Sequence, residues 1–548
     1  MKDKSLTKSI TFNDFKKEIL NDYKTIVISR ETSLLGRKEV LSGKAKFGIF
    51  GDGKELPQIA MAKAFRRGDH RSGYYRDQTF MLALNEISVQ QIFSALYANT
   101  DLKKEPMSGG RQMGSHFMSN YIDEKGDFID STQKYNSSAD ISPTSGQMPR
   151  LLGLAMASKL YRDGSFNSKN FSNNGNEVAW GTIGNASTSE GPFFEVFNAA
   201  GVHQVPMIIS VWDDEYGISV NNSYQTTKSS ISKALHGFKR DKSNKGFEIY
   251  TVDGWDYQSL IQIYEHSSNF CRENHIPILI HVKNLTQPIG HSTSGSHERY
   301  KNKSRLEWEM KYDCNRKMRE WILDNNLSDL SKIEQIEKDC IEFVKSEKKA
   351  AWDNFQKDII VERDSFIKLI KSLVHQYKSK DLAEIANSLL RLKDLGRKDV
   401  MSAARRSLRL ENSSDFFEKI NNWVSDYKKN TQPFYSSHLY NESKNNYKSV
   451  VPVPPQYNHD SKMVDGRLIL RDNFDYLMSK EPNLIFFGED TGKIGDVNQG
   501  LEGLQKKWTK NRVDDRGIRE ASIVGEGIGL AMRGFRPIAE IQYLDYLI

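Results

Sequence analysis

The sequence predicts an α/β fold: a doubly wound parallel sheet, a helical insert and the start of a second α/β domain. Residues 178–220 read as a strand, a helix and a second strand. Helical patterns, short apolar runs and Gly-rich turns alternate over residues 10–300, which is typical of parallel strands joined by crossover helices. A new α/β pattern opens near Met463.

In the first unit, two apolar runs flank a helical pattern. The runs cover residues 178–183 and 207–212, and the helical pattern covers residues 188–203. Asn185 lies just past the first run and Asp214 just past the second. The carboxyl ends of neighbouring parallel strands meet at one edge, where open α/β sheets bind ligands. Amide and carboxylate oxygens are suitable ligands for magnesium, which usually also binds substrate phosphates such as a diphosphate. A surface turn beside an acidic loop would give the same sequence pattern.

The 548 residues are too many for one core and divide into four regions. Charged sequence of helical period follows the first α/β region, with one apolar stripe from Ile333 to Val344 and another from Phe366 to Val374. Proline-rich sequence then favours an extended linker. The predicted boundaries are 1–305 for the first α/β domain, 306–428 for the helical extension and insert, 429–462 for the linker and 463–548 for the last region.

The last region contains only two predicted strands. They cover residues 483–487 and 537–542, with helices predicted over 467–479 and 520–532. Two strands of an open sheet cannot bury both faces, so we expect an incomplete domain and poor solubility of this chain.

Composition indicates a globular protein of a reducing compartment. Hydrophobic residues make up 38% and the net charge is +7, without a basic stripe that would indicate nucleic-acid binding. The three cysteines have no metal-site spacing, the first residues are no secretory signal, and no apolar run reaches the ~20 residues of a membrane span. We expect a cytoplasmic, bacterial protein with neither nucleic-acid nor membrane partners.

Residues 184–191 read Gly-Asn-Ala-Ser-Thr-Ser-Glu-Gly, and residues 213–219 read Asp-Asp-Glu-Tyr-Gly-Ile-Ser. Together they resemble the thiamine diphosphate motif of 2-oxo acid dehydrogenase first components, of branched-chain and pyruvate type. The resemblance implies that Gly184, Ala186 and Ser187 bind the cofactor. It implies a Mg2+ site formed by Asn185, Asp214 and the backbone carbonyl of Tyr216. The family carries the acid at the first position and the amide at the second, so the two ligand types are exchanged here.

Four further segments fit the same family. Residues 73–77 match its Tyr-Arg segment, residues 109–113 its Gly-rich approach segment, residues 142–149 its pyrimidine loop and residues 290–294 its Gly-His-Ser loop. The segment at 109–113 is closest to the branched-chain version. Trp212 stands where branched-chain relatives often have a phosphate-contacting Arg. The implied cofactor-binding residues are Tyr75, Arg76, Ser142 and Thr144, and the implied catalytic histidines are His116 and His291.

The region after the linker resembles the start of the same enzymes' beta subunit. Residues 488–490 read Gly-Glu-Asp, and residues 517–525 match the segment that supplies the catalytic glutamate. By this match Glu520 hydrogen-bonds the pyrimidine ring, while Glu489 and Tyr546 lie near the cofactor. The chain is therefore expected to fuse alpha-like and beta-like portions, with the beta-like portion truncated.

The resemblance implies oxidative decarboxylation of a 2-oxo acid and transfer of the acyl group to the lipoyl domain of a partner dihydrolipoamide acyltransferase. Branched-chain substrates such as 3-methyl-2-oxobutanoate are favoured over pyruvate. The family's assembly implies that a fused chain forms a homodimer. Two other hypotheses stay open: a transketolase-like carboligase, and a truncated, non-catalytic chain that oligomerises or binds partners.

Overall fold

The computed structural model describes residues 11–112, 114–164, 166–291, 296–410, 414–437 and 439–548. Its centre is a parallel sheet of six strands in the order β2-β1-β3-β4-β8-β7. The strands are β1 (His70–Ser72), β2 (Asn136–Ser137), β3 (Ala179–Gly184), β4 (Met207–Trp212), β7 (Glu248–Asp253) and β8 (Ile278–Lys283). A short antiparallel pair follows β4 and consists of β5 (Tyr216–Gly217) and β6 (Val220–Asn221).

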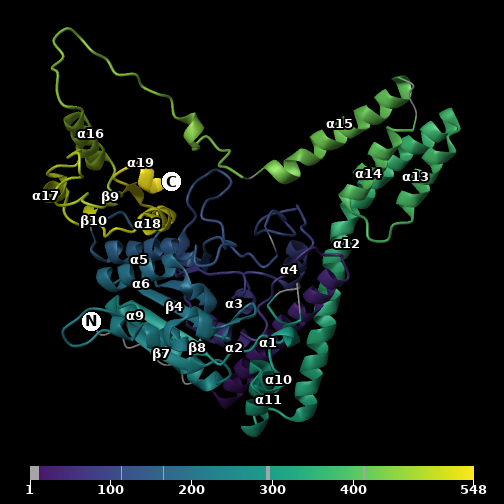
Figure 1. Cartoon of the computed structure of the whole chain (residues 1–548), viewed down its shortest axis with the longest axis horizontal. Coiled ribbons are helices and arrows are strands. Elements are labelled where there is room, and N and C mark those ends of the chain that lie inside the picture. The colour runs from purple at the N-terminus through teal and green to yellow at the C-terminus, as the bar shows by residue number, and fades with distance from the viewer. Residues whose placement is uncertain (1–10, 113, 165, 292–295, 411–413, 438) are drawn as a thin grey trace.

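Helices cover both faces of this sheet (Figure 1). Successive side chains of a strand point to opposite faces, and Ile208 and Ile209 of β4 accordingly belong to two different cores. One core packs the sheet against α1 (Phe12–Leu41), α2 (Glu55–Ala64) and α9 (Tyr257–Asn274). The other packs it against α5 (Met148–Arg162) and α6 (Gly191–His203). The predicted doubly wound parallel sheet is confirmed.

Shorter helices complete this first portion. They are α3 (Gln78–Ala83), α4 (Val89–Leu96), α7 (Asn222–Gln225), α8 (Ile231–Ala234), α10 (Lys303–Lys311) and α11 (Cys314–Asp324). Among the residues that the structure describes, no helix is both long enough and apolar enough to cross a membrane.

A second parallel sheet, with strand order β10-β9-β11, lies in the C-terminal portion. Its strands are β9 (Leu484–Gly488), β10 (Val513–Asp515) and β11 (Arg536–Glu540), and its helices are α16 (Gly466–Lys480), α17 (Leu504–Trp508), α18 (Glu520–Met532) and α19 (Leu544–Leu547). The strands and helices predicted here are present, and β10 is a third strand that the sequence pattern did not predict. β11 ends two residues early, however, and Tyr546 lies on the short helix α19 after the strand rather than at the strand's end.

Helix α18 packs directly on α5 and joins the two portions (Figure 1). Glycines make this close crossing possible. A Cβ atom at Gly153 would lie 2.0 Å from the carbonyl oxygen of Glu526, and one at Gly529 would lie 2.3 Å from that of Arg150. Because these neighbours are backbone atoms, a side chain at either position would push the helices apart. The apolar core that covers α5 and α6 continues into Ile485, Phe487 and Ile523 of the C-terminal portion.

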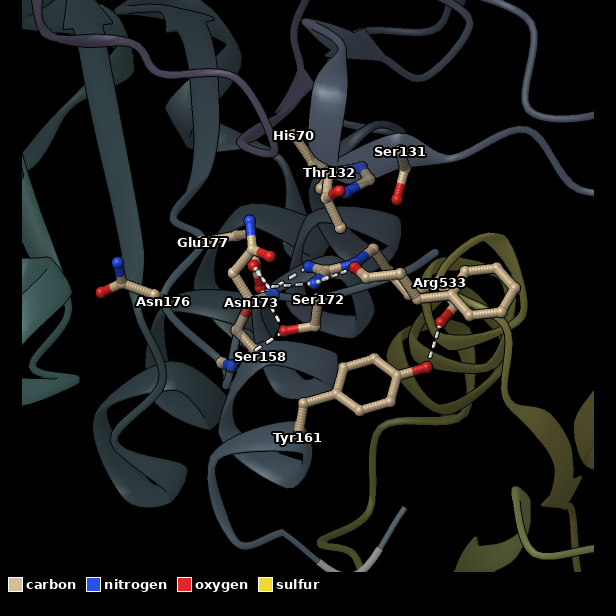
Figure 2. A network of polar contacts seen from close by, with 12 residues as sticks. His70, Ser131, Thr132, Ser158, Tyr161, Ser172, Asn173, Asn176, Glu177 and Arg533 are labelled. Carbon is tan, nitrogen blue, oxygen red and sulfur yellow. Dashed lines mark hydrogen bonds and ion pairs between the residues drawn. The ribbon is translucent and has the colours of Figure 1, made fainter. Parts of the chain in front are cut away.

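A buried polar network crosses the same interface (Figure 2). Arg533, just past α18, reaches into the first portion and pairs with Glu177 at 2.8 Å, with side chains 0% and 3% exposed. Its guanidinium also donates to Ser158 Oγ at 3.0 Å and to the carbonyl oxygens of Leu154 and Phe171. The Tyr161 hydroxyl donates to the Arg533 carbonyl at 2.5 Å. Separating the two portions would leave both members of this deeply buried ion pair without their partner.

One long helix carries both predicted apolar stripes. Helix α12 (Leu330–Tyr377) buries Ile333 and Cys340 against the first portion, whereas Phe366 and Ile370 pack in a separate core. This separate core is formed with α13 (Lys380–Leu390), α14 (Arg397–Ser407) and α15 (Ser414–Ser436). The C-terminal part of α12 and the other three helices form an arm that projects from the body (Figure 1). Residues 441–465 then run, mostly exposed, to α16.

Candidate active site

The predicted metal ligands lie side by side at the carboxyl edge of the six-stranded sheet. Gly184 is paired with Trp212 across β3 and β4, and the Asn185 amide N–H donates to the Trp212 carbonyl at 3.1 Å. Asn185 and Asp214 therefore follow adjacent strand ends, as the strand–helix–strand pattern predicted. Both are buried, with 4% and 7% of the residue exposed.

Local hydrogen bonds orient these two side chains. Asn185 Nδ2 donates to Asn222 Oδ1 at 2.6 Å, which leaves its Oδ1 as the atom that can ligate a cation. Asp214 Oδ1 accepts the Tyr216 N–H at 3.2 Å, which curls the loop back on itself. Arg305 Nη2 donates to the Asp214 carbonyl at 2.9 Å and steadies the same loop. An amide, a carboxylate and a nearby carbonyl fit an octahedral magnesium that keeps other positions for phosphate and water.

Histidine and cysteine have no part in this ligand set. Among the residues that the structure describes, no group of three or more His, Cys, Asp or Glu side chains could hold a metal ion. The predicted donors Asn185, Asp214 and the Tyr216 carbonyl are all hard oxygens, which favour magnesium over zinc or iron.

Asp214 meets a buried cation that the sequence motifs did not predict. Lys54 Nζ lies 2.9 Å from Asp214 Oδ2, and the two side chains are 2% and 10% exposed. Burial by itself would raise the pKa of Asp214, but Lys54, Arg76 and Lys301 outweigh burial and lower it. Asp214 is therefore held as a carboxylate, the form that a metal ion requires.

The Tyr-Arg segment lines the same region. Tyr75 is buried and Arg76 is 5% exposed, with Nη1 donating to the Phe50 carbonyl at 2.6 Å and Nη2 to the His291 carbonyl at 2.9 Å. Burial, followed by the charge of Arg76, lowers the pKa of His291 to about 4. The His291 imidazole is thus neutral at physiological pH and can donate a hydrogen bond. The rest of its predicted loop, residues 292–295, lies outside the described residues.

Two hydroxyl groups face the glycine turn between β3 and α6. A Cβ atom at Gly184 would lie 3.7 Å from the Tyr74 hydroxyl and 4.0 Å from Ser187 Oγ. The Tyr74 hydroxyl is buried and has no hydrogen-bond partner among the described residues. An unpaired buried donor beside a glycine turn fits a phosphate oxygen, which would satisfy it. Ala186 lies in the same turn, between the predicted metal ligand Asn185 and Ser187.

The pyrimidine loop precedes α5. Ser142 and Thr144 are exposed, and the Ser142 hydroxyl lies 3.1 Å from His116 Nε2. The His116 ring lies 5.8 Å from that of Tyr75, so the structure brings this loop next to the Tyr-Arg segment. Met113 of the approach segment lies outside the described residues.

The beta-like portion places Glu520 at the first residue of α18. Glu520 is half-buried rather than buried, and its carboxylate hydrogen-bonds no other described residue. Two residues on, the Ser522 hydroxyl donates to Glu195 of α6 at 2.7 Å, and Gly525 packs on Pro149. The helix that begins with Glu520 therefore lies against the N-terminal turns of α5 and α6, the helices that follow the predicted pyrimidine loop and the predicted metal-binding turn.

The other two predicted residues of this portion differ in position. Burial, the nearby Glu520 and Asp490 raise the pKa of Glu489, whose Oε1 is buried without a described partner. The charge of Glu520 thus acts on the Glu489 carboxyl group. Tyr546 is 53% exposed on α19, and its ring contacts that of Tyr543.

The turn that carries Lys54 belongs to none of the motifs recognised in the sequence. Residues 51–54 read Gly-Asp-Gly-Lys and lead directly into α2. A Gly-rich turn before a helix is a signal that could have indicated a ligand-facing loop. The partner of Lys54, Asp214, lies 160 residues away, so the ion pair itself is invisible to any local pattern.

The comparison with protein families agrees with this geometry. Residues 23–359 match the family of the dehydrogenase E1 component, and residues 462–548 match the transketolase pyrimidine-binding domain. Both are families of thiamine diphosphate-binding enzymes. Because the first match covers more than half of the chain, the chain belongs to the dehydrogenase E1 component family. The predicted order of an alpha-like and then a beta-like portion in one chain is confirmed.

Similar proteins are the separate subunits of such enzymes. The 2-oxoisovalerate dehydrogenase subunit alpha of Bacillus subtilis is 27% identical over 301 residues, which are 54% of this chain and 79% of that protein. The 2-oxoisovalerate dehydrogenase subunit beta of Pseudomonas aeruginosa is 36% identical over 95 residues, 17% of this chain and 27% of the relative. The pyruvate dehydrogenase E1 component subunit beta of Acholeplasma laidlawii is 46% identical over 73 residues, which are 13% of this chain and 22% of that protein. The chain thus spans about a quarter of the beta relatives.

Proposed function

We propose that this chain catalyses the oxidative decarboxylation of a 2-oxo acid and passes the acyl group to a lipoyl group on a partner acyltransferase core. The observation that carries the proposal is the contact between the two portions. Asn185 and Asp214 follow adjacent strand ends in one portion, and α18, which starts with Glu520, packs on α5 and α6 from the other.

Thiamine diphosphate, when bound, supplies the nucleophilic carbon and accepts the electron pair that carbon dioxide leaves behind. Asn185, Asp214 and the Tyr216 carbonyl would hold its magnesium, and Arg76 and Ser187 would contact its diphosphate. Glu520 would hold or release a proton toward the pyrimidine ring nitrogen, and its half-buried position at a helix start suits an acid–base group. The neutral His291 donates to the oxygen that becomes negative on the substrate.

A branched-chain 2-oxo acid is the substrate that we favour. The approach segment at residues 109–113 resembles the branched-chain type, and the alpha-subunit relative is named for 2-oxoisovalerate. Arg111 of this segment donates to the carbonyls of Phe434 and Ser437 at 3.0 and 2.8 Å, so the end of the arm anchors the approach to the site. We also propose that the fused chain assembles as a homodimer in the cytoplasm.

The decisive experiment is Glu520→Gln in the full chain. This substitution keeps the shape of the side chain and removes its proton exchange, so we expect the decarboxylation rate with an artificial electron acceptor to fall about 100- to 10,000-fold. The affinity for thiamine diphosphate, measured by calorimetry, should stay within a few-fold of the unaltered protein. Glu502→Gln, at an exposed ion pair with Arg467, is the matched control.

Two results would contradict the proposal. Full turnover of 2-oxo acids by the Glu520→Gln protein would remove the glutamate from the mechanism. Tight cofactor binding by the unaltered protein without decarboxylation of any 2-oxo acid would favour a non-catalytic, partner-binding role.

A further inference from the structure

The turn at residues 51–54 is built to hold one ammonium group in a fixed place. Gly53 has φ +82°, and a Cβ atom there would lie 2.1 Å from the Thr286 carbonyl oxygen, so the turn is seated directly on the segment that leads to His291. Asp52 Oδ2 accepts the Ile289 N–H at 3.0 Å and anchors the same segment. Lys54 follows, with 2% of the residue exposed.

Three acceptors satisfy the three N–H bonds of Lys54. They are Asp214 Oδ2 at 2.9 Å, Gln287 Oε1 at 2.7 Å and the Thr286 carbonyl at 3.2 Å. Burying an ammonium group has a large desolvation cost, and a buried ion pair seldom stabilises a fold more than apolar side chains of the same size would. A fully coordinated buried lysine at the predicted metal ligand is therefore better explained by binding than by stability.

The charge balance of the site supports this explanation. A diphosphate needs several positive charges, and Trp212, at the end of β4, supplies none: its indole N–H donates to Asp77 at 3.2 Å. Both terminal nitrogens of Arg76 already donate to backbone carbonyls. Lys301 is paired with Glu309 at 2.8 Å. Lys54 is different, because its carboxylate partner is the side chain that magnesium is expected to take over.

We propose that Lys54 is a cofactor-binding residue, which holds the Asp214 carboxylate in place before loading and neutralises diphosphate charge once magnesium engages Asp214. This inference rests on the proposed function and names a cation for the same site. Lys54 and Arg76 also help to keep the His291 imidazole neutral, which places all three side chains within one electrostatic environment.

The test compares thiamine diphosphate with thiamine, which lacks the two phosphates. Calorimetry at saturating magnesium is performed on the unaltered chain, Lys54→Met, Lys54→Arg and the control Lys46→Met, an exposed lysine of the preceding loop. Losing a charge-assisted hydrogen bond should weaken diphosphate binding by Lys54→Met about 10- to 100-fold. Thiamine binding should change less than about threefold, and Lys54→Arg should regain part of the loss.

Equal or tighter diphosphate binding by Lys54→Met would overturn the inference, because Lys54 would then only compete with magnesium for Asp214. An equal loss for thiamine and thiamine diphosphate would also overturn it, since that indicates a structural role. If Lys54→Met does not fold, the affinities for thiamine diphosphate and thiamine are compared in Lys54→Gln instead, because its amide can still donate to Asp214. Failure of the unaltered chain to bind thiamine diphosphate would instead reject the proposed function.

Discussion

At the scale of single residues, neighbours decide which of two adjacent aspartates serves the site. Asp213 Oδ2 lies 2.7 Å from His281 Nε2, and Asn222 Nδ2 lies 3.1 Å from Asp213 Oδ1, so Asp213 is committed to the packing of β8 and α7. Asp214 instead contacts Lys54 at the carboxyl edge of the six-stranded sheet. Asn222 also holds Asn185, which couples the two ligand-bearing strand ends through one amide.

Asp52 should make stability depend on pH. Burial raises the pKa of Asp52 from 3.8 to about 6, against the Ile289 hydrogen bond and the charge of Lys54. A raised folded-state pKa means that the fold favours the neutral acid, so the contribution of Asp52 is present below about pH 4 and lost as the pH rises through about 6. Its upper bound is about 3 kcal/mol.

Chemical denaturation of Asp52→Asn at several pH values tests this sign. Relative to the unaltered chain, Asp52→Asn should gain stability steadily between about pH 4 and pH 7. Asp460→Asn, in the exposed linker, should show a constant difference over the same range. A constant difference for Asp52→Asn as well would contradict the raised pKa.

At the scale of elements, the crossing of α5 and α18 turns two sequence regions into one site. Glycines bring the helix backbones close, and Arg533 enters the first portion next to Glu177 (Figure 2). His70 is buried at the same network, and burial together with Arg533 lowers its pKa well below the usual value. A neutral histidine beside the guanidinium leaves Glu177 as the charge that balances Arg533.

Breaking this pair should loosen the interface between the portions. Arg533→Met leaves the Glu177 carboxylate buried without its cation, which costs about 3–5 kcal/mol. We expect a lower denaturation midpoint and faster amide exchange in α18. Arg533→Met combined with Glu177→Gln should recover much of the loss, whereas the exposed control Arg536→Met should have little effect. Equal midpoints for Arg533→Met and the control would show that the pair does not hold the interface.

At the scale of the whole molecule, a body made of two portions carries a helical arm (Figure 1). Helix α12 contributes to the cores of both body and arm, and the exposed segment 441–465 connects the arm back to the C-terminal portion. The arm thus spaces the two family-matched regions along the chain, while α18 and α5 bring them together in space.

Limited proteolysis should cut the chain into two fragments that stay bound to each other. Cleavage within residues 441–465 leaves the α5–α18 interface, its apolar core and the Arg533 network intact. We expect the two fragments to elute together from size exclusion in non-denaturing buffer and to part in urea. The same digestion of Arg533→Met should release more of the C-terminal fragment. Separation of the unaltered fragments without denaturant would show that the covalent link, and not the interface, keeps the portions together.

The sequence by itself determined the fold class, the cofactor family and the order of the two portions. These depend on local signals: apolar runs, helical periods and short motifs such as residues 184–191 and 213–219. Such signals can be recognised in the sequence without knowledge of the tertiary structure. Tertiary structure alone decided that Lys54 meets Asp214 and that Arg533 meets Glu177. It also decided that the two apolar stripes lie on one helix and serve separate cores. Such pairings join residues far apart in the chain, and they are set by packing and by the need to pair buried charges, which no local pattern records.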